Sequence, residues 1–454
     1  MIRFYIAFYM AKLAKLILKI CRRNGTHLPG KVALKICPNF LQYIAKPEKI
    51  IVVTGTNGKT TVSNLLDDCF EKSGKKVINN RFGGNIIDGI CVSFLMGTGF
   101  TNKSKADIAV IEMDERSSQR VLPYLKPTYL LCTNLFRDSI RRNAHPDFIF
   151  NIINSAIPEE TKLILNADDL ISSQLGTDKN EKTYFAIDKL PTDLSESINI
   201  INDVRICPKC STKLKYNYVR YHHIGNAYCP NCDFKSPVAD YRMTKIDYEN
   251  KKVEIEANGE KTSYKMLSDS IFNMYNMLAV VTVLNKMGIE TEKIKELLDN
   301  EQIAETRYKK ETVNGINIIR HLAKGQNPIA CSCVFDYIKK EKGQKEIILL
   351  LYDHFDAKES SESIVWLYDC DFEFLNDDSI SKIVIGGPRC EDFYLRLLIA
   401  GVPSEKLVYT QNPMDTVNSL SLENSKDIYV LYDVYTDKEA KEVSSKIKEK
   451  IQNK

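Results

Sequence analysis

The chain has 454 residues, of which 44% are hydrophobic, and this is more than a single ordinary core requires. Two or three domains are therefore expected. The 63 basic and 59 acidic residues nearly balance at a net charge of +4, which argues against a nucleic-acid binder that works through bulk charge. Thirteen cysteines, four of them in two Cys-x-x-Cys pairs, fit a reducing cytoplasmic setting better than a disulfide framework.

The first 20 residues are apolar but are interrupted by Arg3, Lys12, Lys15 and Lys19, and no small-residue cleavage site follows. This pattern predicts neither a membrane span nor a signal peptide. Apolar residues recur at helical spacing, which predicts a helix that packs on the protein or rests on an anionic membrane surface, peripheral at its inner face. Packing is the favoured alternative. The apolar residues are Ile6, Tyr9, Leu13, Ile17 and Ile20.

Residues 51–61 predict a strand that leads into a phosphate-binding loop and a helix. Two glycines allow backbone N–H groups to converge on phosphate oxygens at the start of the helix over 59–73. Lys59 is expected to reach the β- and γ-phosphates and Thr60 to ligate Mg²⁺. Val53 stands where the strict pattern requires glycine. The predicted ATP-binding loop consists of Gly55, Thr56, Asn57, Gly58, Lys59, Thr60 and Thr61.

Strand and helix patterns then alternate, as in a parallel sheet covered on both faces. The predicted strands 108–113, 129–133 and 162–165 each end beside polar residues. Since ligands bind at the carboxyl ends of such strands, these residues are candidates for the nucleotide and metal site, with Glu112 as a Mg²⁺ ligand. The polar residues are Glu112, Asp114 and Glu115, then Asn134, Arg137 and Asp138, then Asn166, Asp168 and Asp169.

Between about residues 203 and 236 the alternation gives way to two Cys-Pro-x-Cys knuckles, which predict a zinc ribbon. Four thiolates complete a tetrahedral shell, so the expected role of zinc is structural, and a redox Cys-x-x-Cys is the alternative. His222 and His223 lie between the knuckles and could compete as ligands. The predicted ligands are Cys207, Cys210, Cys229 and Cys232.

Strands are expected again over 241–257 and a helix over 270–287, with a boundary near 305–315. Beyond it, buried-strand patterns alternate with helices, which predicts a second α/β domain. The strand candidates are 316–319, 346–352, 382–385 and 427–431. The expected domains are an N-terminal helical segment at 1–45, an ATP-binding domain at 46–310 and a C-terminal α/β domain at 311–454.

Several strings together make the chain similar to the Mur ligases, and among them to the MurT-type subunits of lipid II isoglutaminyl synthase. The ribbon inside the ATPase domain makes the resemblance specific. It implies a Mur-ligase-like parallel-sheet ATPase domain with an inserted four-cysteine zinc ribbon, followed by a smaller Rossmann-like α/β domain. The strings are Leu28–Lys31, Gly55–Thr61, Gly84–Asn85, Gly89–Ile90, Val110–Glu115, Thr133–Asp138, Leu165–Asp169, Tyr221–Gly225, Asn273–Asn276 and Trp366–Glu373.

The resemblance implies amidation of the D-glutamate α-carboxylate of lipid II through an acyl-phosphate, with ATP, Mg²⁺ and structural Zn²⁺. Ammonia would come from a GatD-type glutamine amidotransferase subunit that docks on the C-terminal domain. Glu112 would join Thr60 at the magnesium and act with Lys59 in catalysis. The further nucleotide-site residues that it implies are Asn134, Asn166, Asp168, Asp169, Asn273 and Arg307.

The chain departs from this family at several positions. The family has an acid three residues before the tryptophan of the Trp366 string, where this chain has Ser363, and the neighbouring Glu362 is the candidate replacement. Asp356 and Asp353 lie farther away. Arg141 stands where a carboxylate is expected. Two further departures are Thr306 in place of a glycine before Arg307 and a rearranged string around Lys324.

Three other functions stay open at this point. The first is a Mur or folylpolyglutamate-type ligase that joins an amino acid to a carboxylate. The second is a degenerate paralogue that binds ATP and a partner without amidating, which Ser363 and Arg141 suggest. The third is a nucleic-acid module on the ribbon, although one short basic strip is more typical of a solvated hairpin.

Overall fold

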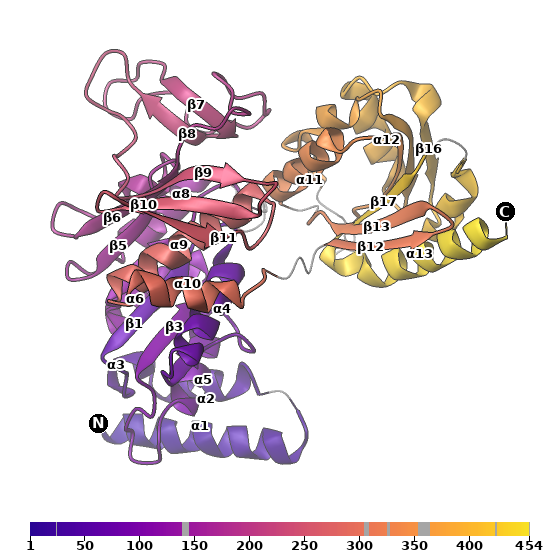
Figure 1. Cartoon of the computed structure of the whole chain (residues 1–454). Helices are drawn as coiled ribbons and strands as arrows, with labels where there is room; N and C mark the ends of the chain where they lie inside the picture. The colour runs from indigo at the N-terminus through magenta and orange to yellow at the C-terminus, as the bar shows by residue number, and fades with distance from the viewer. Residues whose placement is uncertain are drawn as a thin grey trace. The chain divides into compact units, whose positions relative to one another are not determined.

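The structure is a computed structural model, and it describes residues 1–23, 25–138, 145–303, 308–324, 327–352, 364–422 and 425–453. Contacts divide the chain into two compact units (Figure 1). The first unit comprises Met1–Leu135, Pro146–Ile198 and Asn202–Ile303, and the second comprises Phe136–His145, Asn199–Ile201 and Ala304–Lys454.

Within the described residues, the first unit is built on a nine-stranded sheet with the order β11, β10, β9, β6, β5, β4, β1, β3, β2. Strands β1 to β6 run parallel to their neighbours, and β9 pairs parallel with β6, which confirms the predicted Mur-ligase-like parallel sheet. The bounds are β1 (Lys49–Thr54), β2 (Val77–Asn79), β3 (Ile108–Glu112), β4 (Tyr129–Cys132), β5 (Lys162–Asn166), β6 (Lys182–Ile187), β9 (Tyr241–Asp247), β10 (Lys252–Ala257) and β11 (Glu260–Lys265).

One edge of this sheet is antiparallel. Strands β9, β10 and β11 pair antiparallel. The connection from β10 to β11 is the tight turn of Asn258 and Gly259, which both have positive φ, at 52° and 82°. So short a connection can join only antiparallel neighbours, because a parallel crossover needs a dozen or more residues. The parallel sheet therefore ends in an antiparallel meander.

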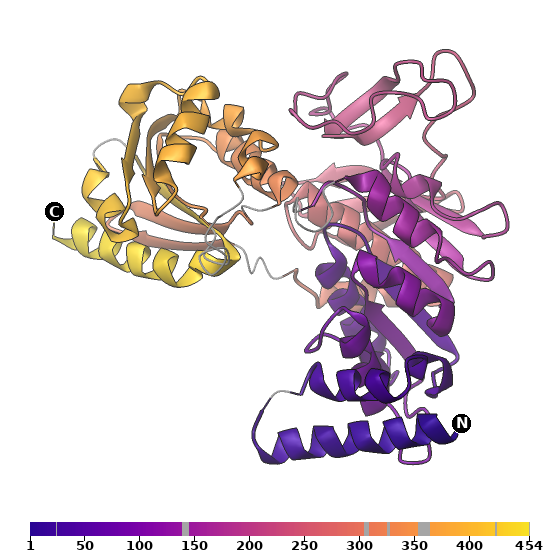
Figure 2. The same cartoon turned by 180° about the vertical axis from the view of Figure 1, so that it is seen from behind.

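Helices cover both faces of the sheet. Alternate strand residues such as Val52, Ile111 and Leu130 belong to a core shared with α5, α6 and α8. On the opposite face, α4 contacts β3, and α9 contacts β5, β6 and α4. Figure 2 shows the helices of the first face in front of the strands, in purple. The bounds are α4 (Lys59–Lys72), α5 (Ile87–Met96), α6 (Ser118–Leu125), α8 (Pro146–Asn154), α9 (Ile271–Lys286) and α10 (Thr291–Asp299).

The N-terminal segment forms α1 (Ile2–Ile20), α2 (Leu28–Ile36) and α3 (Phe40–Tyr43). Helix α1 packs on α2 and α5, and Phe4, Phe8 and Phe40 lie in the shared core. The predicted packing of this helix on the protein is therefore present on one of its faces. Among the helices that the structure describes, none combines the length and apolarity needed to cross a bilayer.

The second unit has a six-stranded sheet, counted over the described residues, with the order β12, β13, β17, β14, β15, β16. All neighbours pair parallel except β12 with β13. Alternate residues of β14 face two different cores, since Ile347 and Leu349 contact one and Ile348 and Leu350 the other. This is the predicted Rossmann-like α/β domain. The bounds are β12 (Tyr308–Val313), β13 (Ile316–Leu322), β14 (Lys345–Leu350), β15 (Ile380–Gly386), β16 (Leu407–Thr410), β17 (Asp427–Tyr432), α11 (Pro328–Lys340), α12 (Cys390–Ile399) and α13 (Asp437–Gln452).

Candidate nucleotide site and cysteine cluster

The loop between β1 and α4 has the backbone of a phosphate cradle. Gly55 and Gly58 have φ values of 124° and 90°, in the region that side chains disfavour. A Cβ on Gly55 would collide with Thr133 Oγ1, and one on Gly58 would collide with Asn276 Oδ1. Both glycines are therefore required by conformation and by space, and the loop ends at the N-terminus of α4, where backbone N–H groups attract anions.

Residues after β4 hold this loop in place. The Thr56 N–H donates to the Asn134 carbonyl oxygen at 2.8 Å, and the Asn57 N–H donates to Asn134 Oδ1 at 3.0 Å. Asn134 Nδ2 and Thr133 Oγ1 both donate to the Asn57 carbonyl oxygen, at 3.0 and 2.6 Å. The Asn134 side chain is thus engaged with the loop itself, and a direct contact with ATP stays a prediction.

Lys59, the residue expected to bind phosphate, pairs with Glu115. Its Nζ lies 2.6 Å from Glu115 Oε1 and also donates to the Gly55 carbonyl oxygen. Burial lowers the pKa of the Lys59 ammonium, but attraction to Glu115 and the hydrogen bond with it outweigh burial, so the pKa is raised. Burial raises the pKa of the Glu115 carboxyl, and Lys59 partly offsets this. The ammonium therefore stays charged beside the loop.

Glu112 lies at the carboxyl end of β3, on the strand adjacent to β1. Its backbone is held by Asn80, and its Oε1 accepts a hydrogen bond from Asn85 Nδ2 at 3.0 Å. Thr60 lies in the first turn of α4 and is exposed. A carboxylate and a hydroxyl are hard oxygen donors that suit Mg²⁺, so these two residues fit the predicted metal by their chemistry.

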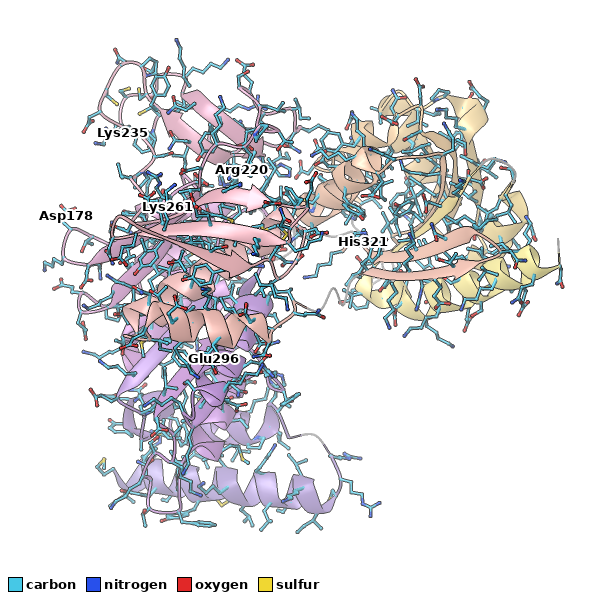
Figure 3. The ribbon with its side chains drawn as sticks, viewed as in Figure 1. Asp178, Arg220, Lys235, Lys261, Glu296 and His321 are labelled. Carbon is cyan, nitrogen blue, oxygen red and sulfur yellow. The ribbon has the colours of Figure 1, made fainter. Side chains whose placement is uncertain are left out.

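Asp168 and Asp169 follow β5, and both are completely buried. Asp168 accepts hydrogen bonds from the hydroxyls of Tyr275 and Tyr218 at 2.6 and 2.9 Å, and its Oδ2 lies 3.2 Å from Arg220 Nη1. Burial raises the pKa of the Asp168 carboxyl although Arg220 opposes this. Arg220, labelled in Figure 3, lies on β7 (Lys215–Tyr221), which pairs with β8 (Ile224–Tyr228) in the ribbon hairpin.

Asp169 connects the same hairpin to the residues after β4, which hold the phosphate loop. Its Oδ1 lies 3.1 Å from His223 Nε2, and its Oδ2 accepts the Leu135 N–H at 2.7 Å, next to Asn134. Burial alone would raise the pKa of Asp169, but the His223 contact and further donors lower it overall. Asp168 and Asp169 thus anchor the ribbon hairpin. Their contact with the nucleoside stays a prediction.

Two asparagines complete the predicted nucleoside side of the site. Asn166 Oδ1 accepts the Asp168 N–H at 3.0 Å, and its Nδ2 donates to the Thr133 carbonyl oxygen at 3.3 Å. Asn273, in the first turn of α9, donates to Ser268 Oγ at 3.0 Å and accepts from Asn276 Nδ2 at 3.1 Å. Asn276 thereby connects Asn273 to Gly58 of the phosphate loop.

The four predicted zinc ligands, Cys207, Cys210, Cys229 and Cys232, come together, with all four sulfur atoms within 4.8 Å of one another. The Cys207–Cys232 and Cys210–Cys229 sulfurs are 3.5 and 3.4 Å apart. These separations far exceed the ~2.05 Å of a disulfide and approach the ~3.8 Å edge of a tetrahedron with Zn–S bonds of ~2.3 Å. The donor set therefore fits zinc. The suggested competition by histidine is not seen for His223, which contacts Asp169.

Sequence reasoning missed three contributions to this site. Glu115 was named only within an acidic cluster, yet it is the partner of Lys59. Arg220 and Tyr275 were not recognised, because they lie 52 and 107 residues from Asp168 in the sequence and no local pattern links them. Several predicted residues lie outside the described part of the chain, namely Arg141, Thr306, Arg307, Asp353, Asp356, Glu362 and Ser363.

Comparison with known proteins supplies the family. Residues 53–229 match the Mur ligase middle domain, and residues 324–437 match the MurT ligase C-terminal domain. The chain is 34% identical to the lipid II isoglutaminyl synthase (glutamine-hydrolysing) subunit MurT of Staphylococcus aureus (strain COL), over 88% of this chain and 89% of the relative. Identity to the MurT subunit of Streptococcus pneumoniae (strain ATCC BAA-255 / R6) is 31%, over 90% of each chain.

Solved structures show the same fold at lower identity. A pseudomurein peptide ligase type C from Methanothermus fervidus aligns with a TM-score of 0.67 at 22% identity, over 90% of this chain and 80% of that one. MurF from Acinetobacter baumannii aligns with a TM-score of 0.63 at 13% identity, over 91% and 80%. Taken with the two domain matches and the full-length relatives, these findings show that the chain belongs to the MurT family within the Mur ligases.

Proposed function

We propose that this chain is the ATP-using subunit of a lipid II isoglutaminyl synthase. It converts the α-carboxylate of D-glutamate in the lipid II stem peptide to the amide, giving D-isoglutamine for peptidoglycan synthesis. The single observation that carries the proposal is the phosphate loop with Lys59, held at the end of β1 in a chain that is 34% identical to a MurT subunit over 88% of its length.

The chemistry requires such a loop because a carboxylate is a poor electrophile. A carboxylate oxygen attacks the γ-phosphorus of ATP, ADP leaves, and the resulting acyl-phosphate is attacked at its carbonyl carbon by ammonia. Phosphate leaves and a proton is lost from nitrogen, so that the amide remains. Lys59 and the loop N–H groups stabilise the charge on the transferred phosphoryl group.

Thr60 and Glu112 would hold Mg²⁺, which neutralises phosphate charge when bound. Asn273 and the segment from Asn166 to Asp169 are proposed to lie toward the nucleoside, and Arg307 is a further proposed nucleotide-site residue. The four cysteines of the ribbon would hold a structural Zn²⁺ with no open coordination position for catalysis, which is supported by the spacing of their sulfur atoms.

A GatD-type glutamine amidotransferase subunit is the proposed source of ammonia and partner in a heterodimer. We assign its docking to the C-terminal domain, residues 311–454, and ATP chemistry to residues 46–310, behind the N-terminal segment 1–45. Glu362 is the proposed substitute for the acid that the family carries where this chain has Ser363. The reaction is placed in the cytoplasm at the inner face of the membrane, where a lipid-linked substrate is accessible.

The test is ATP-dependent amidation of lipid II, followed by mass spectrometry of the stem peptide, with the purified chain and its co-purified amidotransferase subunit. Ammonium and glutamine are compared as nitrogen donors. Activity with both supports the synthase and means that Glu362 or another acid replaces the family's acid. If Glu362 is that acid, Glu362→Gln should remove only the glutamine-dependent rate. Activity with ammonium alone would refute the role of Glu362.

Lack of amidation with both donors, in a preparation that binds ATP, would favour the degenerate paralogue. Addition of an amino acid in place of ammonia would instead favour the amino-acid ligase. A Lys59→Ala variant is the matched negative control in every arm.

A further inference from the structure

Helix α1 has two apolar faces, and only one of them is covered by the protein. Phe4, Ala7, Phe8 and Ala11 are buried against the rest of the first unit. The opposite side carries apolar residues at alternating spacings of four and three, which on a helix place them in one stripe. This outer face consists of Ile2, Ile6, Tyr9, Leu13, Leu16 and Ile20, with exposed fractions from 48% to 81%.

The position of α1 is also fixed by hydrogen bonds to the segment around Phe100. The Tyr9 hydroxyl donates to the Phe100 carbonyl oxygen at 3.1 Å, and Lys12 Nζ donates to the Leu95 and Thr98 carbonyl oxygens at 3.1 and 3.0 Å. In Figure 1 the helix lies along the margin of the first unit, next to α2. The outer face is therefore presented by a helix that is already folded and docked.

Phe100 extends this apolar surface beyond the helix. Its side chain is 75% exposed, and its ring lies 5.4 Å from Lys12 Nζ. It belongs to the turn between α5 and β3, where Lys103 and Lys105 are also exposed. An aromatic ring flanked by lysines beside an apolar stripe is a chemistry that suits the boundary between acyl chains and headgroups.

The charge around α1 indicates which kind of partner covers its outer face. Residues 1–47 contain nine Lys and Arg residues and no Asp or Glu, although the whole chain carries only +4, so the remainder is net acidic. Lys19, Arg22 and Arg23 are exposed at the C-terminal end of α1. Two copies of so basic a surface would repel each other, whereas anionic phospholipid headgroups would attract it.

We propose that the outer face of α1, together with Phe100, binds the surface of an anionic phospholipid bilayer. The helix lies in the interface plane with its inner side still packed on the protein, and it does not cross the membrane. Basic side chains contact the headgroups while the apolar stripe enters the acyl boundary. This surface would account for the proposed membrane location, and it is separate from the phosphate loop.

The experiment is flotation of the full chain with vesicles of phosphatidylglycerol and phosphatidylcholine in equal parts, and with phosphatidylcholine alone. The chain is expected to bind the anionic vesicles and to bind the neutral ones much more weakly. Leu13→Glu/Leu16→Glu should reduce partitioning about 100-fold or more, because two leucines lose burial and two acids are added. Lys19→Gln/Arg23→Gln should reduce it about 30-fold, at about 1 kcal/mol for each charge.

The matched control is Val238→Glu/Ile399→Glu, which adds the same charge at exposed apolar residues that do not belong to α1 and should bind as the unmodified chain does. Leu13→Ser/Leu16→Ser tests the contribution of leucine burial to membrane binding without adding charge. Unchanged melting temperatures establish that each variant is folded. Failure of the unmodified chain to float, or equal flotation of the Leu13/Leu16 variants, would overturn the proposal.

Sedimentation velocity without vesicles tests whether a second copy of the chain covers the outer face of α1. A dimer that the Leu13/Leu16 substitutions dissociate would also overturn the membrane assignment. ATP turnover on a water-soluble muropeptide should be the same in all these variants. If the unmodified chain shows no ATP turnover, this result would count against the proposed function and not against the membrane surface.

Discussion

The Nζ atom of Lys59 lies 2.6 Å from Oε1 of Glu115, and both side chains are largely buried. The phosphate-binding cation thus has a counter-charge inside the protein. Glu115 comes from the segment that follows β3, so the pair joins two neighbouring strand ends. When phosphates occupy the loop, they can replace the carboxylate as the partner of Lys59.

The first prediction concerns the cation itself. Lys59→Ala should reduce ATP turnover at least about 100-fold, because the charge on the transferred phosphoryl group loses its nearest stabilising cation. Steady-state release of ADP measures this. Lys72→Ala is the control, since Lys72 lies in the last turn of the same helix and pairs with Glu301. Unchanged turnover in Lys59→Ala would refute the phosphate-loop assignment.

The second prediction tests the pairing. Glu115→Gln leaves Lys59 as a buried cation without its carboxylate, which should cost the ligand-free protein about 3–5 kcal/mol of unfolding free energy. ATP should restore part of this by supplying phosphate oxygens, so the ATP-induced rise in melting temperature should exceed that of the unmodified chain. Differential scanning fluorimetry with and without ATP measures both. An equal ATP shift in the two proteins would show that Glu115 and phosphate do not exchange at Lys59.

The third prediction separates space from backbone conformation. Gly58 and Gly315 have φ values of 90° and 81°, but a Cβ would collide with Asn276 only at Gly58, whereas Gly315 has open space around it. Either substitution by alanine should cost about 1–2 kcal/mol of stability for the left-handed backbone. Only Gly58→Ala should also abolish binding of a fluorescent ATP analogue. Normal binding by Gly58→Ala would exclude the close approach of Asn276 to the loop.

The fourth prediction concerns the cysteine cluster. Cys207→Ala should lower the zinc content of the purified chain from one ion toward zero and destabilise the ribbon, because three thiolates no longer complete a tetrahedral shell. Acidification should release the metal from the unmodified chain, since protons compete for the thiolates. Cys21→Ala, at an exposed cysteine of the same chain, is the control for elemental analysis. Equal zinc in both variants would refute the site.

The fifth prediction compares two arginines. Arg220 pairs with Asp168 while both side chains are almost completely buried, and Arg242 pairs with Asp188 at 3.1 Å near the surface. Arg220→Met should cost about 3–5 kcal/mol, because Asp168 and Asp193, which is also buried and lies 2.7 Å from Arg220 Nη2, both lose their cation in the interior. Arg242→Met should cost about 1 kcal/mol or less. Chemical denaturation gives both values, and similar losses would mean that neither Asp168 nor Asp193 depends on Arg220.

Features with a fixed local spacing were predictable from the sequence. The two glycines and the lysine of the phosphate loop, the helix over 59–73, and the four cysteines depend on neighbours within a few residues, so their pattern carries the information. The buried strands β13, β14, β15 and β17 were found for the same reason, as short apolar runs. Strands β6, β12 and β16 were missed. β12 is largely polar and exposed, and β6 and β16 have only short apolar runs, of four and three residues.

The sequence by itself determined the chemistry available to this protein: a phosphate loop, a set of thiolates and an α/β scaffold of the MurT family. Only the tertiary structure decided which groups meet, since Lys59 and Glu115 are 56 residues apart and Asp168 and Arg220 are 52 apart. It also decided that α1 packs by one face and leaves the other exposed, because helical periodicity reveals apolar stripes but not which of them the protein covers.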